Sequence, residues 1–165
     1  RAFEVGADVP LATMLDRGVN AAEGELITAF DPRDVYGPEF IGDLALALIY
    51  ADAEVVGKAA HFSAAPDGAS PVLHEPAASF RHVDRVSGAA WLARRAVLEQ
   101  ASIEEMLSFK DDRPMIACAN GLGRIYSADP YNYLRVEAAG VAPAAIAASL
   151  DGNRSSANGA AAVMI

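Results

Sequence analysis

The chain has 165 residues, 53% hydrophobic and 21% charged, which is the composition of one folded globular domain and excludes an intrinsically disordered chain. Its net charge of −9 argues against nucleic acids and anionic membranes as partners. Cys118 is the only cysteine, so an internal disulfide bond is impossible and a reducing, cytoplasmic location is expected. No apolar run reaches the ~18 residues that a membrane helix needs, so no membrane span is expected.

The first predicted elements are a short strand or connector over residues 1–7 and an amphipathic helix after it. Asp8 and Pro10 are helix-start signals, because the fixed φ of proline is tolerated in the first turn. Gly24 is expected to end the helix. The apolar and small residues that recur at helical spacing are Leu11, Met14, Leu15, Gly18, Val19 and Ala22.

A short apolar segment, Glu25–Phe30, follows this helix. Its periodicity fits either a strand or a buried helix, and its length of about six residues between turn signals favours a strand. Continuous apolar character is typical of a parallel strand that is covered on both faces. We therefore expect Glu25–Phe30 to be an interior strand of the sheet.

Two carboxylates, Asp31 and Asp34, come directly after this predicted strand. Ligands of open α/β sheets bind at the carboxyl ends of the strands, and hard cations take oxygen ligands. The two residues are thus candidates for holding a divalent cation or a ribose hydroxyl. The alternative is that both are ordinary turn residues, since Asp readily bonds its own backbone in turns.

Further elements are predicted up to residue 100. A helix over Pro38–Ala51 is expected to be well buried, because apolar residues surround almost its whole circumference. A strand over Ala53–Phe62 is followed by a surface loop over Ser63–Ala78, which is rich in Ala, Pro, Ser, Gly and Asp. A second strand is expected over Val83–Ala93 and a short helix over Arg94–Gln100.

The segment RGVNAAEGELITAFDPRDVYGPEF, residues 17–40, resembles the core of an inverting family 2 glycosyltransferase with the GT-A fold. RVSGAAWLARRAVLEQ, residues 85–100, is similar to a part of that family that helps to shape the acceptor site. FKDDRPMIACANGLGRIYSADPYNYLRV, residues 109–136, resembles a third part, in which an acidic pair begins a helix. The positions of the first segment that keep the family register are Gly18, Ala22, Gly24, Glu25, Ile27, Asp31, Asp34, Tyr36 and Pro38.

The resemblance implies an α/β protein with a GT-A-like mixed or parallel sheet covered by helices in residues 1–137, and an Ala/Ser/Gly-rich tail, partly helical or disordered, in residues 138–165. It implies transfer of a sugar from a nucleotide-sugar donor to an acceptor hydroxyl with inversion. Asp112 holds the position of the general base. The donor-binding and cofactor-binding positions are Asp16, Asp31, Arg33 and Asp34, of which Asp31 and Asp34 are the metal ligands for Mn²⁺ or Mg²⁺. The alternative to a catalytic role is that Asp112 is the N-cap of a helix, where its function would be structural.

Arg33 departs from the family pattern, because its position in the turn is normally the aspartate that contacts the metal. Leu15-Asp16 replaces an Arg-Asn pair, and no His-Thr-Trp segment follows Arg135. Arg33 either pairs with a diphosphate in place of the metal, or neutralises Asp31 and marks an inactive site. We therefore expect weak or absent metal binding. The alternative function is a catalytically degenerate GT-A-like module that binds a sugar or a protein.

The βα units with which the family begins, and which hold the nucleotide base, have no counterpart before Leu11. An incomplete fold of this kind leaves a sheet edge and an apolar side of the helix Pro38–Ala51 open, and both promote association. Besides a nucleotide-sugar donor and a sugar-type acceptor, the expected partners are therefore a second copy, as a homodimer, or a missing N-terminal segment. Asp31 and Asp112 are expected to face one cleft, about one substrate width apart.

Overall fold

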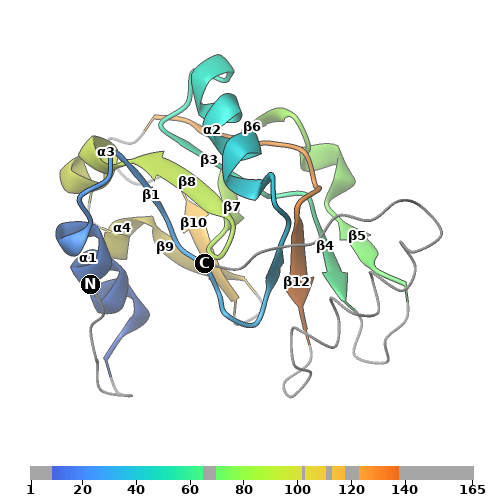
Figure 1. Ribbon diagram of the computed structural model, residues 1–165, viewed down its shortest axis with the longest axis horizontal. Helices are drawn as coiled ribbons and strands as arrows, with labels where there is room; N and C mark the ends of the chain where they lie inside the picture. Colours follow the sequence, from blue (N-terminus) through green and yellow to red (C-terminus); the bar gives the residue numbers. More distant parts are fainter. Residues whose placement is uncertain (1–8, 65–69, 102, 111–112, 118–122, 138–165) are drawn as a thin grey trace.

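The computed structural model describes residues 9–64, 70–101, 103–110, 113–117 and 123–137, which form a mixed α/β structure (Figure 1). The helices are α1 (Leu11–Ala21), α2 (Phe40–Tyr50), α3 (Arg95–Gln100), α4 (Ile103–Met106) and the 3₁₀ helix η1 (Pro76–Ala78). The strands are β1 (Leu26–Thr28), β2 (Val35–Tyr36), β3 (Val55–Gly57), β4 (His61–Ala64), β5 (Val72–His74), β6 (Arg81–Val83), β7 (Arg85–Ser87), β8 (Trp91–Arg94), β9 (Leu107–Lys110), β10 (Arg113–Ala117), β11 (Ile125–Ser127) and β12 (Tyr133–Val136).

The strands of the described residues form a central sheet in the order β1-β8-β3-β11-β6 and two smaller sheets, β2-β12-β4-β5 and β7-β10-β9. In the central sheet β3 and β11 are parallel, and the other neighbours are antiparallel. In the four-stranded sheet β4 and β12 are parallel. The expected α/β class with a mixed sheet is therefore confirmed, and the alternative of a parallel sheet is wrong.

The prediction of an interior strand at Glu25–Phe30 is wrong, because β1 lies at the edge of the central sheet. It pairs antiparallel with β8, with Ile27 opposite Ala93. Leu26 is 40% exposed and Phe30 50% exposed. One face of the segment packs against the core through Ile27, and the ring of Phe30 packs on those of Tyr36 and Phe40. A continuous apolar run is thus compatible with an edge strand when an outer residue finds partners in other elements, as Phe30 does in β2 and α2.

Two predicted strands are each divided among shorter strands of different sheets. Ala53–Phe62 contains β3 of the central sheet and the start of β4 of the four-stranded sheet, and Val83–Ala93 contains the end of β6, the whole of β7 and most of β8. At the end of β3, a Cβ atom on Gly57 would lie 2.6 Å from the carbonyl oxygen of Ala90. Glycine is required there because the backbones approach so closely. The predicted loop Ser63–Ala78 also contains the end of β4, β5 and η1.

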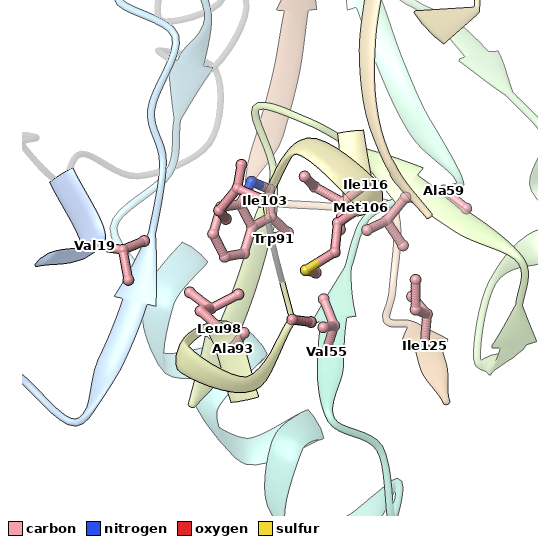
Figure 2. Close-up of a cluster of buried hydrophobic side chains, with 12 residues drawn as sticks. Val19, Val55, Ala59, Trp91, Ala93, Leu98, Ile103, Met106, Ile116 and Ile125 are labelled. Atoms are coloured by element: carbon pink, nitrogen blue, oxygen red, sulfur yellow. The ribbon is translucent and has the colours of Figure 1, made fainter. Parts of the chain in front are cut away.

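The larger core lies between the central sheet, the helices α1, α3 and α4, and the sheet of β7, β9 and β10. Figure 2 shows Trp91 near its centre, beside Ile103 and Met106. The indole N–H of Trp91 donates a hydrogen bond of 2.9 Å to the carbonyl of Gly88, so its one polar group is satisfied. Trp91, which is 1% exposed, is therefore a core residue.

The helices α1 and α3 begin and end close to the predicted positions. Pro10 precedes α1, and the N–H of Ala22 closes the helix by bonding the carbonyls of Gly18 and Val19, before Gly24 is reached. The helix α2 covers the second face of the central sheet through Phe40, Leu44 and Leu48. It is not well buried as expected, because the side that faces away from the sheet is exposed.

The segment after Asp112 was expected to be a helix, and this is wrong for its described part. Residues Arg113–Ala117 form β10, between β7 and β9, and Ile116 is fully buried in the larger core. Pairing on both sides satisfies the backbone of this segment, although Pro114 has no N–H to donate. The alternative in which Asp112 is the N-cap of a helix is therefore wrong, because Arg113 begins a strand and not a helix.

Several predictions fall outside the described residues: those for residues 1–7, for the tail 138–165, for Cys118 and for Asp112 itself. Within the described part of the chain, none of the helices combines the length and the apolar character required to cross a bilayer.

Candidate functional site

The acidic turn after β1 is closed by an ion pair between Asp31 and Arg33. The Nε of Arg33 lies 2.9 Å from Oδ1 of Asp31, and its Nη2 lies 2.6 Å from Oδ2, so the guanidinium binds both carboxylate oxygens. The backbone N–H of Arg33 also donates to Oδ1 of Asp31 at 2.9 Å. Asp31 thus acts as a turn residue that bonds its own backbone, and hydrogen bonding to it raises the pKa of Arg33.

Asp34, the second candidate ligand, points into the protein. It is 6% exposed, and its two oxygens accept hydrogen bonds from the Tyr133 hydroxyl at 2.8 Å and from the Val136 N–H at 3.0 Å. The carboxylate therefore joins the turn to β12. A buried carboxylate with such donors is satisfied without a metal ion.

The hydroxyl of Tyr36 holds the acidic turn in place through two hydrogen bonds. It accepts a hydrogen bond from the N–H of Asp31 and donates one to the carbonyl of Ala89, both at 2.8 Å. Burial raises the pKa values of Tyr36 and Tyr133 above their usual range, so both phenols stay protonated and keep donating. Tyr36 and Tyr133 both lie in segments whose sequence resembles the glycosyltransferase family, but no local pattern indicated that their hydroxyls would hold the acidic turn.

A cleft of about 300 Å³ opens beside the turn, between α1 and the connection from β7 to β8. Its walls are apolar, with Asp31 and Arg33 as the charged side chains of the lining. Phe30 contributes a half-exposed ring. The lining residues are Leu11, Leu15, Ala29, Phe30, Asp31, Pro32, Arg33, Gly88 and Ala89. The volume is within the range of small-molecule sites.

The other predicted site residues lie apart from this cleft or outside the described residues. Asp16 is half-buried on α1. The residues of this helix that line the cleft are Leu11 and Leu15, and Asp16 is not part of the lining. Asp112 is not among the described residues, so the expected shared cleft with Asp31 stays a prediction. The structure therefore brings Asp31 and Arg33 together on the cleft and directs Asp34 into the core.

The carboxylates of the turn do not form a cation site as they are arranged. Both oxygens of Asp31 bind Arg33, and both oxygens of Asp34 accept internal hydrogen bonds. Among the residues that the structure describes, no three His, Cys, Asp or Glu side chains are grouped to hold a metal ion. A divalent cation at the turn would require Arg33 to leave Asp31.

A buried ion pair that the sequence did not suggest lies beneath α2. Lys58 is fully buried, and its Nζ lies 3.1 Å from Oδ2 of Asp129, whose side chain is 20% exposed. Burial lowers the pKa of Lys58, and the adjacent Asp129 opposes this shift. Lys58 directly follows β3, and Asp129 comes two residues after the end of the parallel strand β11, so the pair joins the segments that leave these two strands.

Two of the three histidines stack on the four-stranded sheet, His61 on β4 and His74 on β5, with ring centroids 5.4 Å apart. His61 is 6% exposed, its Nδ1 lies 2.9 Å from the carbonyl of Ala59, and burial lowers its pKa to about 4. His74 bonds the hydroxyl of Ser63 at 2.7 Å. Ser63 thus holds the ring of His74, whereas Nε2 of His61 is buried and has no hydrogen-bond partner among the described residues.

Comparison of the sequence with protein-family models and with curated proteins gives no match to this chain.

Proposed function

We propose that this chain is a GT-A-like module that binds a neutral sugar in the cleft beside the acidic turn, and that it does so without a divalent cation. The observation that supports this most is the pair of Asp31 and Arg33. In it a carboxylate and a guanidinium neutralise each other at the rim of the cleft. A family member that transfers sugar with a metal would need this carboxylate for the metal.

The chemistry of the cleft suits a sugar better than a charged ligand. The ion pair has no net charge, but it offers N–H donors from Arg33 and carboxylate acceptors from Asp31 to hydroxyl groups. Leu11, Leu15 and the half-exposed ring of Phe30 form an apolar surface against which the C–H face of a sugar ring can pack. An apolar cleft with a few polar groups is the usual form of a small-molecule site.

Inverting transfer from a nucleotide-sugar donor is the second candidate function. The same cleft supports it, because Asp31 and Arg33 both line it and a free guanidinium binds phosphate oxygens in a bidentate manner. In that case Arg33 exchanges Asp31 for a diphosphate, and Asp112 is the proposed base. The two functions therefore differ in what happens to the Asp31–Arg33 pair when ligand binds.

The indole N–H of Trp91 is a reporter for this cleft, because it is the only tryptophan and it bonds the carbonyl of the lining residue Gly88. Neutral monosaccharides, nucleotide sugars and uridine diphosphate are titrated while its NMR signal is followed, in EDTA and in Mn²⁺. Release of nucleoside diphosphate from the nucleotide sugars is measured in parallel. The variants are Phe30→Ala and Arg33→Ala. Phe109→Ala on β9 is the matched control, since Phe109 is also an exposed ring but does not line the cleft.

The sugar-binding function predicts that a neutral sugar shifts the Trp91 signal equally in EDTA and in Mn²⁺. Phe30→Ala and Arg33→Ala weaken this binding, and Phe109→Ala leaves it unchanged. Binding that requires both the diphosphate and Mn²⁺, with release of nucleoside diphosphate, would replace the proposal by the transferase function. If none of the ligands shifts the signal, both functions are rejected for this cleft.

A further inference from the structure

The cleft beside the acidic turn is uneven in exposure, and its charged end is its outer end. Phe30, Pro32 and Arg33 are exposed members of the lining, and the side chain of Arg33 is 66% exposed. A ligand that fills the cleft therefore meets the ion pair at the rim and apolar carbon atoms farther in. The inner lining, which is half-buried or buried and carries no ionisable side chain, consists of Leu11, Leu15, Ala29, Gly88 and Ala89.

The backbone groups of the inner lining between β7 and β8 have partners within the chain. The N–H of Gly88 donates to the carbonyl of Pro114, and the carbonyl of Gly88 accepts from the tryptophan indole, both at 2.9 Å. The N–H of Ala89 donates to Oγ of Ser87 at 3.3 Å. The carbonyl of Ala89 accepts from the hydroxyl of Tyr36 at 2.8 Å. All four polar backbone groups of this wall are thus used inside the protein.

Buried hydroxyl groups hold this wall in its arrangement. The hydroxyl of Tyr133 donates its only hydrogen to Oδ2 of Asp34, so in its contact of 3.2 Å with Oγ of Ser87 the serine is the donor. Oγ of Ser87 then accepts from the N–H of Ala89. Ser87 is 6% exposed and Tyr133 is 3% exposed, and hydrogen bonds in such places are costly to break. The wall therefore keeps its polar groups for the chain and offers a ligand an apolar surface.

The opposite side of the cleft is apolar as well. Leu11 and Leu15 lie four positions apart on α1, so their side chains are neighbours on one face of the helix. Leu15 also packs against the larger core, which holds this face in place. The inner lining is thus apolar on both sides of the cleft.

A sugar without a substituent matches the rim of the cleft better than its interior. Its hydroxyl groups surround the ring, and those that turn toward the inner lining lose water without gaining a hydrogen-bond partner. At the rim, the ring of Phe30 and the charged groups of Arg33 suit the two kinds of surface that a sugar presents. The inner lining instead suits a hydrocarbon group attached to the sugar.

We propose that the ligand of the cleft is a glycoside with an apolar aglycone, an alkyl or aryl group on the anomeric carbon. The sugar lies at the rim beside Phe30 and Arg33, and the aglycone lies on the inner lining. This inference rests on the proposed sugar-binding function and names the class of sugar compound that the cleft takes. The cleft of about 300 Å³ is at the small end of ligand sites, so the aglycone is short.

The test is titration of the full chain with the methyl, butyl and hexyl β-glycosides of glucose, galactose and mannose, followed by the indole N–H signal of Trp91. Each methylene group that is buried strengthens binding up to about fourfold, so the hexyl glycoside is expected to bind about tenfold or more tightly than the methyl glycoside. Hexanol, which lacks the sugar, is expected to bind more weakly than the hexyl glycosides. Fucose, a deoxyhexose with a methyl group on the ring, tests attachment of the apolar group at another carbon.

The ratio of the hexyl to the methyl affinity isolates the contact of the aglycone from that of the sugar. Leu11→Asn keeps the size of the side chain but places an amide on the inner lining, and is expected to lower this ratio about threefold or more. Leu11→Met keeps the apolar volume and is expected to keep the ratio. Arg33→Ala weakens the binding of both glycosides and leaves their ratio unchanged. Leu46→Asn, the same change at a 61% exposed leucine of α2, is the matched control and alters neither affinity.

The orientation of the ligand is measured on the unchanged chain, so it does not depend on how a variant folds. Intermolecular nuclear Overhauser effects are recorded with the hexyl glycoside that binds most tightly. The hexyl protons are expected to contact the methyl groups of Leu11 and Leu15, and the sugar protons to contact the ring of Phe30. The reverse orientation would overturn the proposal.

The outcomes separate this inference from the function on which it rests. Equal affinities for the methyl and hexyl glycosides reject the apolar aglycone and leave the sugar-binding function in place. The aglycone is also rejected if hexanol binds as tightly as the hexyl glycosides, if fucose binds more tightly than they do, or if Leu46→Asn lowers the ratio as much as Leu11→Asn does. If none of the glycosides shifts the Trp91 signal, the sugar-binding function itself is rejected, and this inference with it.

Discussion

The hydroxyl of Tyr133 donates a hydrogen bond of 2.8 Å to Oδ2 of Asp34, across 99 positions of the chain. Together with the N–H of Val136, it holds the acidic turn against β12, so the geometry of the cleft depends on a strand distant in sequence. The hydrogen bond is buried and its acceptor is a carboxylate, which makes it stronger than a neutral one.

Tyr133→Phe is expected to lower the free energy of unfolding by about 1.5–3 kcal/mol. The substitution removes the hydroxyl that donates to Oδ2 of Asp34, and this oxygen is buried. The control is Tyr131→Phe, since the ring of Tyr131 is 62% exposed. Its effect is expected to stay within about 0.5 kcal/mol. Urea unfolding of both variants measures the difference, and equal effects would mean that the Tyr133 bond contributes nothing net.

His61 makes stability depend on pH in the direction opposite to a paired histidine. Burial lowers its pKa to about 4, from an unfolded value of 6.5. Above pH 6.5 the ring is neutral in both states. Between pH 6.5 and pH 4 the unfolded chain binds the proton first, so stability falls as the pH falls, by roughly 3 kcal/mol in total. Below pH 4 both states are protonated and the loss is complete.

Subtracting the pH dependence of His61→Phe from that of the wild type isolates this effect, because the carboxylates titrate in both proteins. His82→Gln serves as the control, since His82 is an exposed histidine. It is expected to keep the full loss between pH 6.5 and pH 4. A difference curve that is flat over this interval would contradict a buried neutral His61.

The ion pair of Lys58 and Asp129 is expected to respond unequally to the loss of either partner. Asp129→Asn leaves a fully buried ammonium without a counterion and should cost about 3 kcal/mol or more. Lys58→Met keeps a similar volume and leaves a carboxylate that still reaches water, so it should cost less than about 1.5 kcal/mol. Unfolding at pH 7 tests the order. In Asp129→Asn stability should also rise toward pH 10, because the buried lysine releases its proton at a lower pH than the unfolded lysine, which still binds one over this interval.

Two glycine-to-alanine substitutions should have opposite signs. Gly57→Ala places a methyl group 2.6 Å from the carbonyl of Ala90 and should cost about 1–3 kcal/mol through overpacking. Gly18→Ala, on α1, meets none of the described residues within 4 Å and should stabilise by up to about 1 kcal/mol. Thermal unfolding compares the two. Stabilisation of both would show that β3 and β8 are less closely packed than the structure has them.

The acidic turn should bind metal only after its central residue is changed. At about 4 Å and an effective dielectric of ~20, two unit charges interact by roughly 4 kcal/mol, so Arg33 opposes a cation at Asp31. Calorimetric titration with Mn²⁺ is expected to give weak or no binding to the wild type and stronger binding to Arg33→Asp. Arg17→Asp, at an exposed position of α1, makes the same charge change and should not help. Equal micromolar binding to wild type and Arg33→Asp would place the metal elsewhere.

The elements that could be predicted from the sequence are those specified by neighbours along the chain. Pro10 and the helical spacing of Leu11, Leu15 and Val19 predict α1, and α3 follows similarly from its own segment. The order of the strands could not be predicted in this way, because β1 pairs with residues about 65 positions away and no local sequence pattern indicates that pairing. A short apolar segment has the same composition whether it forms an edge strand or an interior strand, so its composition does not reveal its place in the sheet.

The same limit explains the site. Asp31 and Asp34 are two carboxylates of one turn, yet one pairs with Arg33 at the surface and the other is buried. Their fates are decided by Tyr133 and Val136, which a local motif cannot include. For Arg33, the alternative in which it neutralises Asp31 agrees with the observed contacts. The segment Arg113–Ala117 was misjudged because its partners, β7 and β9, determine its conformation.

The position of β11 and β12, the latest strands in the described part of the chain, has a consequence for how the protein is made. β11 lies between β3 and β6, and β12 lies between β2 and β4, so each occupies the interior of its sheet although it leaves the ribosome after its neighbours. Until residue 136 has emerged, four earlier strands expose the edges that these two will cover. Such unpaired edges associate readily with other chains. Nascent chains that stall before Tyr133 are therefore the forms of this protein that most need a chaperone.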